Sequence, residues 1–177
     1  TFKGECDNIA KTGIPVTKRI VIAKKAHLIL PTHRLLDAAN EAAMGKSKIG
    51  STLKGIGPTY TDKIGRYGLR VGDILAADFE ERYAKLQNRH ITLLNQMGFE
   101  CDPHAEDAAF MEAVNFLKEF ELVDCEYYIN NLLKDNEILA EGAQGSMLDI
   151  DYGSYPFVTS SSTACAGACI GLGVNPR

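Results

Sequence analysis

A glycine-rich stretch in the first half of the chain most constrains what it can fold into, because glycine reaches backbone conformations that other residues avoid. Seven of the 16 glycines lie between residues 45 and 73, with Pro58 among them. No helical or strand period is apparent, so we expect a long loop here. Loops of this length in compact domains are either functional or disordered. Interspersed apolar residues favour the ordered kind: Ile49, Ile56, Tyr60, Ile64, Leu69 and Val71.

Regular elements are expected on both sides of this loop. The apolar run at residues 20–23 is typical of a strand buried on both faces, as in a parallel sheet. After a second apolar stretch at 28–30, Thr32 is a suitable helix cap, and apolar residues at helical spacing continue to Gly45. Residues 137–140 (EILA) have the pattern of another short buried strand. The sequence therefore predicts an α/β fold with strands of a mainly parallel sheet.

Two long helices are expected in the second half of the chain. Apolar residues recur every three or four positions over 79–97 and again from 109 to about 134. Two such helices are expected to pack as an antiparallel hairpin. We divide the chain into a strand–helix part with the glycine-rich substrate loop (1–78), a helical-hairpin insertion (79–134) and a strand with a substrate-binding segment (135–177). All three are expected to be parts of one truncated domain of a longer chain.

Composition excludes several classes of protein. With 45% hydrophobic and 24% charged residues, the chain is typical of a globular domain and not of a disordered one. No apolar run approaches the roughly 20 residues of a membrane-spanning helix, so no membrane partner is expected. The net charge of 19 − 23 = −4 argues against a nonspecific nucleic-acid binder. Five irregularly spaced cysteines without a secretory pattern predict reduced thiols in a cytoplasmic protein.

The first candidate binding segment is GSTLKGIGPTY at residues 50–60. Its glycines let backbone N–H groups approach an anion closely, and Ser51 and Thr52 add hydroxyl donors. A phosphate is therefore one possible ligand, and a surface loop whose glycines only serve turns is the alternative. Positive charge is supplied within 15 residues by Lys54, Lys63 and Arg66.

The second candidate is EGAQG at residues 141–145, directly after the expected strand 137–140. In open α/β sheets, ligands bind beyond the carboxyl ends of strands. The Gln144 amide has both a donor and an acceptor, which suits the edge of a base, and the flanking Gly142 and Gly145 leave room for it. The alternative is a turn glutamine that hydrogen-bonds the backbone.

The third candidate is the run of five hydroxyl residues at 159–163, ahead of a small-residue helix. Such a run can cap the helix and bind an anion at its N-terminus, and capping alone is the simpler interpretation. Asp149 and Asp151 precede it. Their expected roles are capping and salt bridging, not catalysis.

Three further patterns are not assigned a role in binding. The triplet Gly-Lys-Ser at 45–47 resembles the end of a Walker A loop, but Asn40 stands where that loop needs glycine, and a helix precedes it where a strand is required. Cys101 and His104 could begin a zinc site, but no second ligand pair follows at a usual spacing. His90 lies on the apolar face of its expected helix and is interpreted as a half-buried packing residue.

Taken together, these motifs resemble one family. STLKGIGPTYTDKIGRYGLRVGD, followed from residue 141 by EGAQGSMLDIDYGSYPFVTSSSTACAG, closely resembles the adenylosuccinate synthetases, as does AHLILPTHRLLDAANE. The resemblance implies an incomplete P-loop-NTPase-like synthetase fold. It also implies a homodimeric parent enzyme that ligates L-aspartate to IMP with GTP and Mg²⁺, through 6-phosphoryl-IMP. The products are adenylosuccinate, GDP and phosphate, in the first committed step of AMP synthesis. A non-catalytic nucleotide-phosphate-binding module is the alternative.

The resemblance implies four contacts with IMP. Thr52 and Thr159 resemble the family's two phosphate-binding threonines, and Gln144 resembles the glutamine that contacts the hypoxanthine ring. Arg66 resembles an arginine that crosses the dimer interface to the partner's IMP. The resemblance assigns no catalytic residue and no metal ligand to this chain.

Two departures from the family pattern stand out. The family commonly reads STGRGIGP, and here Leu53 and Lys54 replace Gly-Arg, which we expect to alter local loop shape more than function. The family's GDEGKGK loop, with the catalytic aspartate, and its catalytic histidine would lie before Thr1. Its GTP-base and aspartate-binding segments would follow Arg177. We therefore expect that the 177 residues alone do not complete the reaction and that the Mg²⁺ ligands lie outside them.

Overall fold

The computed structural model describes residues 1–47 and 50–176, so Ile49 and Arg177 lie outside the described residues. Short 3₁₀ helices occupy Val16–Lys18, Gly45–Ser47, Val71–Leu75 and Ser146–Leu148. The regular elements are α1 (Phe2–Ala10), β1 (Val21–Ala23), α2 (Pro31–Ala43), α3 (Ile56–Gly65), α4 (Phe79–Gln96), α5 (Asp107–Leu117), β2 (Glu121–Val123), α6 (Cys125–Leu132) and α7 (Ala166–Leu172).

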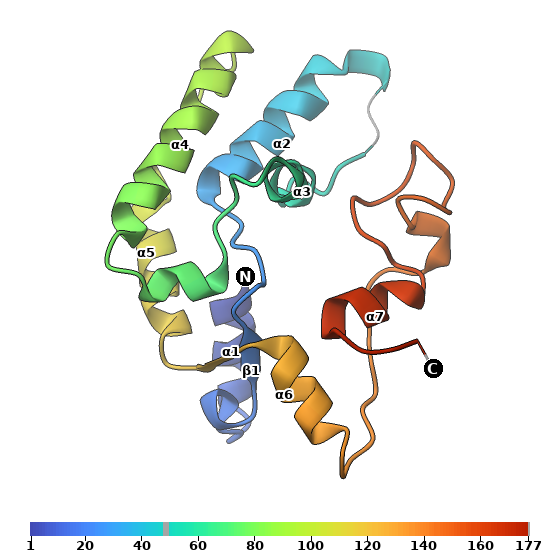
Figure 1. Ribbon diagram of the computed structural model, residues 1–177. Helices are drawn as coiled ribbons and strands as arrows, with labels where there is room; N and C mark the ends of the chain where they lie inside the picture. The colour runs from blue at the N-terminus through green and yellow to red at the C-terminus, as the bar shows by residue number, and fades with distance from the viewer. Residues whose placement is uncertain (48–49, 177) are drawn as a thin grey trace.

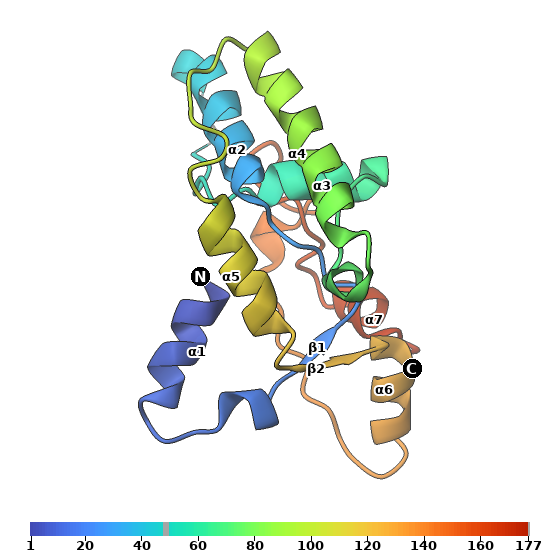
Figure 2. The ribbon, with the colours of Figure 1, turned by 90° about the vertical axis from the view of Figure 1, so that its left-hand side faces the viewer.

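A small parallel sheet lies near the middle of the fold, and it confirms the predicted α/β class and strand direction. β1 pairs with β2 from Val21 opposite Glu121 to Ala23 opposite Val123. The expected burial on both faces is wrong, because Val21 remains 38% exposed. Helices α2, α3 and α4 form a layer above the sheet in Figure 1, and α6 begins directly after β2, at the carboxyl end of the two parallel strands (Figures 1 and 2).

The hydrophobic core consists of three clusters, all built from residues of the first 122 or so. The largest brings α4 and α5 against the segments on either side of the glycine-rich stretch: Leu28, Leu30, Leu69, Val71, Ile74, Phe79, Tyr83, Leu86 and Val114. A second joins α1 to the sheet through Cys6, Val16 and Phe120. A third joins α2 to α4 through Leu36, Ala39 and Leu94. No helix in the described part of the chain combines the length and apolar character needed to cross a bilayer.

The first of the two long helices is confirmed. α4 runs from Phe79 to Gln96, and Gly98 follows in the left-handed region at φ +64°. The second is wrong beyond Leu117, because the chain there forms β2 and then α6. The spacing over 116–127 also fits a helix, but pairing with β1 decides the outcome, as tertiary contacts often override local propensity. α5 returns along only the first half of α4, where the Tyr83 and Phe110 rings stack 5.1 Å apart.

The glycine-rich stretch is ordered as predicted, but it is not loop throughout, because it contains the ten-residue helix α3. Ile56 and Ile64 are exposed on this helix, at 36% and 77%. Its buried residues are Pro58, Thr59 and Asp62. A helix that buries a polar face has no apolar period, which is why the pattern in the sequence did not reveal it.

The strand expected at 137–140 is wrong. Leu139 is 94% exposed, and these residues make no backbone hydrogen bond with any other segment that the structure describes. A strand requires a neighbouring strand for its N–H and C=O groups, and the sheet formed by β1 and β2 does not reach this segment.

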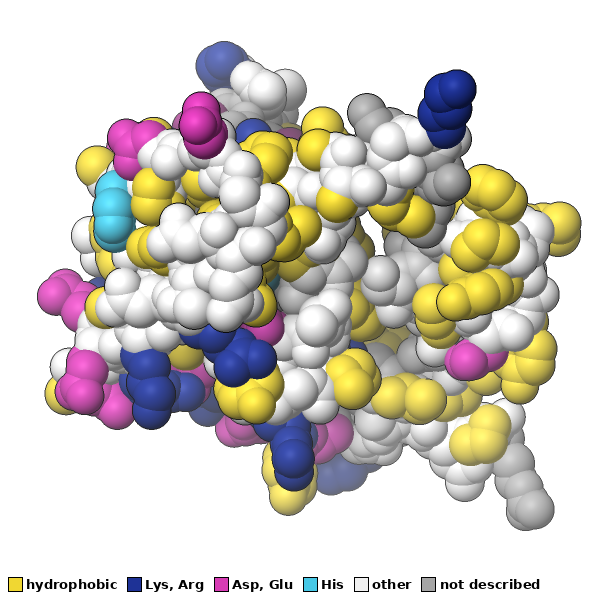
Figure 3. Space-filling model, turned by 90° about the horizontal axis from the view of Figure 1, so that it is seen from above, with side chains coloured by type: hydrophobic (Ala, Val, Ile, Leu, Met, Phe, Trp, Pro, Cys, Tyr) yellow, Lys and Arg dark blue, Asp and Glu magenta, His cyan; other side chains and the backbone are white. Residues whose placement is uncertain are grey.

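The C-terminal part of the chain docks through polar and close backbone contacts. The Asn130 side-chain amide on α6 donates to the Gly173 carbonyl over 2.9 Å. A Cβ on Gly173 would lie 2.6 Å from Glu126 Cβ, so only glycine allows this approach. In the sequence between α6 and α7, the loop 145–164 carries four large exposed hydrophobic side chains: Met147, Tyr152, Tyr155 and Phe157. Figure 3 shows hydrophobic groups gathered on the side of the molecule where this loop lies.

Candidate substrate-binding site

The loop that carries Thr52 is held at both ends by one buried carboxylate on α2. Asp37, only 6% exposed, accepts a 2.6 Å hydrogen bond from Ser51 Oγ on one oxygen. Its other oxygen accepts the Gly55 backbone N–H over 2.8 Å. Thr52 lies between these two anchors and is exposed. The arrangement fixes the backbone around Thr52 while leaving this residue open to solvent.

Gly55 and Leu53 of this loop adopt left-handed backbone conformations. Gly55 has φ +81°, and an added Cβ would lie 3.0 Å from atoms of His33, so the loop packs directly on α2. Leu53 has φ +55°, a conformation in which a side chain is unfavourable. The position where the family commonly has glycine therefore has a backbone that suits glycine, which gives the Leu53 departure a physical consequence.

Helix α3 begins at the end of this loop and carries Arg66 at its other end. Arg66 caps α3 in the left-handed conformation at φ +65° and is exposed. Ten residues at about 1.5 Å each separate the two ends of α3 by roughly 15 Å. Arg66 therefore lies well away from the Thr52 loop of its own chain.

A buried network fixes α3 against α2 and α4. His33 Nε2 and His90 Nε2 both donate to Asp62 Oδ2, over 2.9 and 2.8 Å. Thr32 Oγ1 lies 2.7 Å from the other nitrogen of His90, and the Leu30 backbone N–H donates to the other nitrogen of His33. His90 is 1% exposed, so its interpretation as a half-buried packing residue is wrong: it is fully buried and hydrogen-bonded.

The three side chains His33, Asp62 and His90 are close enough to hold a metal ion, with candidate ligand atoms within 4.8 Å of one another. Their hydrogen bonds argue against it. Because His33 Nδ1 accepts from a backbone N–H, its Nε2 must carry the proton and has no lone pair for a metal. Mg²⁺ also prefers oxygen ligands, which this cluster does not supply in sufficient number. The residues of this cluster therefore do not fit Mg²⁺.

Electrostatics of the network agree with a neutral His33 beside an ionised Asp62. Burial lowers the pKa of His33, although the hydrogen bond to Asp62 acts in the opposite direction. Burial raises the pKa of Asp62, but the hydrogen bonds from the two histidines outweigh it and hold the pKa well below its usual range. The network is thus a structural anchor with its donors and acceptors matched.

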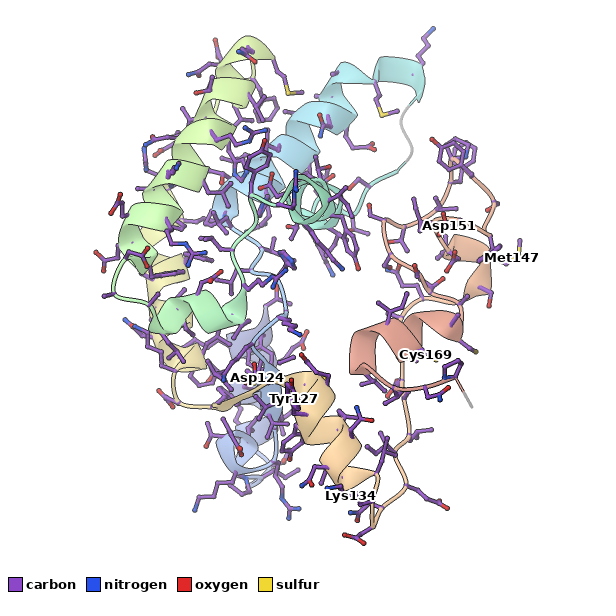
Figure 4. The ribbon with its side chains drawn as sticks, in the orientation of Figure 1. Asp124, Tyr127, Lys134, Met147, Asp151 and Cys169 are labelled. Atoms are coloured by element: carbon purple, nitrogen blue, oxygen red, sulfur yellow. The ribbon has the colours of Figure 1, made fainter. Side chains whose placement is uncertain are left out.

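Gln144 and Thr159 lie on either side of a loop organised by Asp149. Gln144 is exposed and has a glycine on either side in the sequence, Gly142 and Gly145. A Cβ added to Gly142 would meet nothing within 4 Å, and Gly145 has φ +104°. The Thr159 backbone N–H donates to the Leu148 carbonyl over 2.9 Å. Figure 4 labels Met147 and Asp151 on this loop, to the right of α3 in Figure 1. Asp149 caps a turn by accepting the N–H groups of Asp151 and Tyr152, as expected. The expected salt bridge is wrong, because none of the ion pairs in the described part of the chain involves Asp149.

The structure brings the Thr52 and Thr159 segments together. A Cβ on Gly57, at the start of α3, would lie 3.7 Å from Ser160 Oγ, an ordinary contact distance. Gln144 is tied to the hydroxyl run because Thr163 Oγ1 donates to the carbonyl of its neighbour Gly145 over 2.7 Å. Three of the four predicted residues thus belong to adjoining segments, and Arg66 stands apart from them.

Sequence reasoning missed the buried residues that hold these segments. Asp37 and Asp62 received no role, and His33 was not singled out. A signal existed for Asp37: it is the one acidic residue among the apolar positions over 35–39, on the face that α2 buries. Asp62 carried no comparable signal, because its partners are 28 and 29 residues away in the chain.

Comparison with known proteins agrees with the resemblance. The sequence model of the adenylosuccinate synthetase family matches residues 1–177. The chain is 59% identical to the adenylosuccinate synthetases of Parabacteroides distasonis and Porphyromonas gingivalis, over 99% of this chain and 42% of each relative. A solved structure, a fully ligated adenylosuccinate synthetase from Plasmodium falciparum, matches 98% of this chain and 41% of its own at 34% identity and a TM-score of 0.86.

The matches cover nearly all of this chain but less than half of each relative. The chain spans 42% of the length of the curated relatives it matches, while nearly every one of its own residues is aligned. Sequence and structure comparisons point to the same family, and the family model extends from the first residue to the last. The chain belongs to the adenylosuccinate synthetase family.

Proposed function

We propose that this chain carries much of the IMP-binding surface of an enzyme that joins L-aspartate to IMP with consumption of GTP. The observation that carries the proposal is the meeting of two hydroxyl-bearing segments, one with Thr52 and one with Thr159, at Gly57 and Ser160. These segments are more than 100 residues apart in the sequence, and each holds a threonine that resembles a phosphate-binding threonine of the family. Membership of the family supports the substrate class.

Each predicted residue has a chemical role that suits its surroundings. The hydroxyls of Thr52 and Thr159 donate to the IMP phosphate, helped by the positive charge of nearby Lys54. The Gln144 amide pairs with the hypoxanthine edge, where its donor and acceptor match the N1–H and the 6-oxygen. Glycines on either side leave the amide exposed, which supports access by a flat ring.

Arg66 acts on the second subunit in this proposal. Its position at the far end of α3 keeps it away from the Thr52 loop of the same chain, and its exposure leaves it free to reach across an interface. A homodimer with two-fold symmetry would bring each Arg66 to the partner's IMP phosphate. A cation placed at a bound phosphate contributes charge-assisted hydrogen bonds.

The proposed reaction proceeds in two steps. GTP phosphorylates the 6-oxygen of IMP, which converts a poor leaving group into phosphate, and the aspartate amine then displaces it at C6. Residues of this chain bind and orient IMP, since such chemistry depends chiefly on positioning and charge stabilisation. GTP, Mg²⁺ and aspartate are held by other parts of the enzyme. We place the reaction in the cytoplasm, which the five free thiols support.

Calorimetric titration of IMP into the chain tests the proposal, with inosine as the phosphate-free control. We expect IMP to bind and inosine to bind at least about tenfold more weakly, because the phosphate contacts are lost. Thr52→Ala, Thr159→Ala and Gln144→Ala should each weaken IMP binding. Thr92→Ala is the matched control, because it removes an exposed threonine on α4. Absence of IMP binding, or equal binding by all four variants, would overturn the proposal.

The role of Arg66 has its own test. If it reaches the partner's site, mixing Arg66→Ala with Gln144→Ala yields heterodimers in which one site regains all its residues. About a quarter of all sites are then intact for random pairing of the two variants. Recovery of that fraction of IMP binding supports a role across the interface. No recovery in a mixture that forms heterodimers contradicts it.

A turnover assay separates the enzyme from its alternative, a binding module without catalysis. Full-length protein should form adenylosuccinate from IMP, aspartate and GTP. Binding of IMP without turnover by the full-length protein would favour the module.

A further inference from the structure

Asp149 is a buried carboxylate whose acceptors are used by the backbone. Its side chain is 1% exposed, although the loop around it is open to solvent. Oδ2 accepts the Ala164 N–H over 2.9 Å, and Oδ1 accepts the N–H groups of Asp151 and Tyr152 over 2.9 and 3.1 Å. No lysine, arginine or histidine in the described ranges forms an ion pair with it. Its charge is therefore balanced by peptide dipoles.

The bond from Ala164 closes a loop that begins and ends beside predicted binding residues. Two backbone hydrogen bonds support the same closure: Thr159 N–H to the Leu148 carbonyl over 2.9 Å, and Ile150 N–H to the Ser161 carbonyl over 3.2 Å. Both connect the residues next to Asp149 with the hydroxyl run. The placement of Thr159 thus depends on the conformation that Asp149 stabilises.

The same loop fixes the segment that carries Gln144. Thr163, the residue before Ala164, donates its hydroxyl to the Gly145 carbonyl over 2.7 Å. Gly145 directly follows Gln144, so this bond connects the amide that reads the base to the loop that holds the phosphate-binding threonine. Asp149 and Thr163 together set the distance between the two ends of the proposed IMP site.

Apolar packing does not hold this loop in place. None of the three hydrophobic clusters among the described residues contains a member beyond Leu122. The large side chains of the loop point outward, with Tyr152 84% and Tyr155 75% exposed. Its backbone is wound tightly around Asp149, since a Cβ on Gly153 would lie 2.5 Å from the Asp149 carbonyl oxygen. Hydrogen bonds therefore support the loop internally, and the Asp149 carboxylate accepts three of them.

We propose that Asp149 is a positioning residue for IMP binding, which sets the relative placement of Gln144 and Thr159 without contacting the nucleotide. The inference rests on the proposed function and adds a residue to it. If the inference holds, loss of Asp149 lowers the affinity for IMP without lowering the stability of the whole protein, because the loop lies outside the hydrophobic core. Loss of Asp149 should disorder the loop and weaken IMP binding while the core remains folded.

The first test compares Asp149→Asn with Asp135→Asn, which removes the same charge from an exposed residue after α6. Asparagine keeps the shape of the side chain, but its NH₂ group replaces one of the two oxygens that accept backbone N–H groups. At least one of these hydrogen bonds must therefore break. We expect the dissociation constant for IMP to rise at least about tenfold in Asp149→Asn and to stay unchanged in Asp135→Asn. Hydrogen exchange should speed up in 145–164 alone, with an unchanged thermal midpoint.

A second pair of variants avoids changing the buried charge. Thr163→Val removes the hydroxyl that donates to Gly145 but keeps the shape, and Thr163→Ser keeps the hydroxyl. We expect Thr163→Val to weaken IMP binding and Thr163→Ser to bind nearly as the unaltered chain does. Equal affinities for the two would overturn the inference, as would unaltered IMP affinity and exchange in Asp149→Asn.

The two proposals fail in different ways. An unaltered chain that binds no IMP overturns the proposed function, and the positioning role falls with it. An unaltered chain that binds IMP, together with an Asp149→Asn variant that binds it equally well, overturns the positioning role alone. A lower thermal midpoint in Asp149→Asn, in proportion to its loss of affinity, would show a general structural role and would also overturn it.

Discussion

Gly55 donates its backbone N–H to Asp37 Oδ2 over 2.8 Å, across 18 residues of sequence. Together with the bond from Ser51, this contact attaches both ends of the Thr52 loop to α2. A buried carboxylate that accepts a backbone N–H fixes a loop more firmly than surface contacts do, because both groups are shielded from water and would be left without a hydrogen-bond partner if the contact broke.

Removal of the Asp37 carboxylate should destabilise the protein. Asp37→Ala leaves the Gly55 N–H without its acceptor, and we expect the free energy of unfolding to fall by about 1–3 kcal/mol. Ser51→Ala removes only the hydrogen bond from Ser51 to Asp37, and the free energy of unfolding should fall by about 0.5–1.5 kcal/mol. Urea denaturation measures both. A Ser51→Ala variant as unstable as Asp37→Ala would contradict the importance of the Gly55 contact.

Substitutions at Leu53 should follow backbone conformation and not hydrophobicity. Because Leu53 has φ +55°, Leu53→Gly should be neutral or stabilising by up to about 1 kcal/mol. Leu53→Val should be destabilising by about 1–2 kcal/mol, since a branched Cβ fits this region poorly. Leu75→Gly, at a residue 61% exposed without positive φ, is the matched control and should cost about 1 kcal/mol. Urea unfolding that ranks Leu53→Gly below Leu53→Val would refute the conformational explanation.

Arg66 should show a trade between stability and function. Its φ of +65° at the end of α3 is the position where helices prefer glycine. We expect Arg66→Gly to be more stable than Arg66→Ala by about 1 kcal/mol, while both lose the proposed contact with the partner's IMP. Thermal unfolding and IMP titration on the same samples give both quantities. If Arg66→Ala were the more stable variant, the strain at this residue would be disproved.

Mild acid should destabilise the fold through His33. Its pKa is lowered in the native state, so the unfolded state binds more protons as the pH falls below about 6.5. Stability is therefore complete above that pH and should be lost below it, by up to about 1.4 kcal/mol per pH unit for one histidine. Below about pH 4, protonation of Asp62, whose native pKa is lowered, adds to the loss.

Urea unfolding between about pH 7 and pH 5 measures this effect. His104→Gln, which changes a histidine whose side chain is 60% exposed, should keep the same dependence on pH. Stability that is flat or that rises on acidification would contradict the burial of an uncharged His33.

Metal ions should not stabilise the histidine network. Since His33 Nε2 and His90 Nε2 both donate to Asp62, neither has a lone pair available for a metal. Stoichiometric Zn²⁺ or excess EDTA should leave the thermal midpoint unchanged. A zinc-dependent rise that persists in His104→Gln, where the exposed Cys101–His104 pair is broken, would show that the network binds metal after all.

Several features of the fold were predictable from local patterns. The apolar run at 20–23 indicated a parallel strand, and the spacing from Phe79 to Gly98 gave α4 with both ends. Asp149 was expected to cap, and it does accept three backbone N–H groups. The expected capping of the following helix by the hydroxyl run is wrong, because Cys165 is the N-cap of α7 and no side chain caps it. The strand, α4 and the turn after Asp149 depend on residues within a few positions of each other, so the sequence pattern contains the necessary information.

The motifs in the sequence also determined the family and four predicted contacts with IMP, which remain to be tested. Only the tertiary structure decided that residues 121–123 form a strand, that α3 forms within the glycine-rich stretch and that 137–140 does not pair. It alone showed that Asp37 and Asp62 anchor the site, because their partners are 14 to 29 residues away. Strand pairing and buried polar networks depend on which distant segments meet, and no local period in a sequence records that.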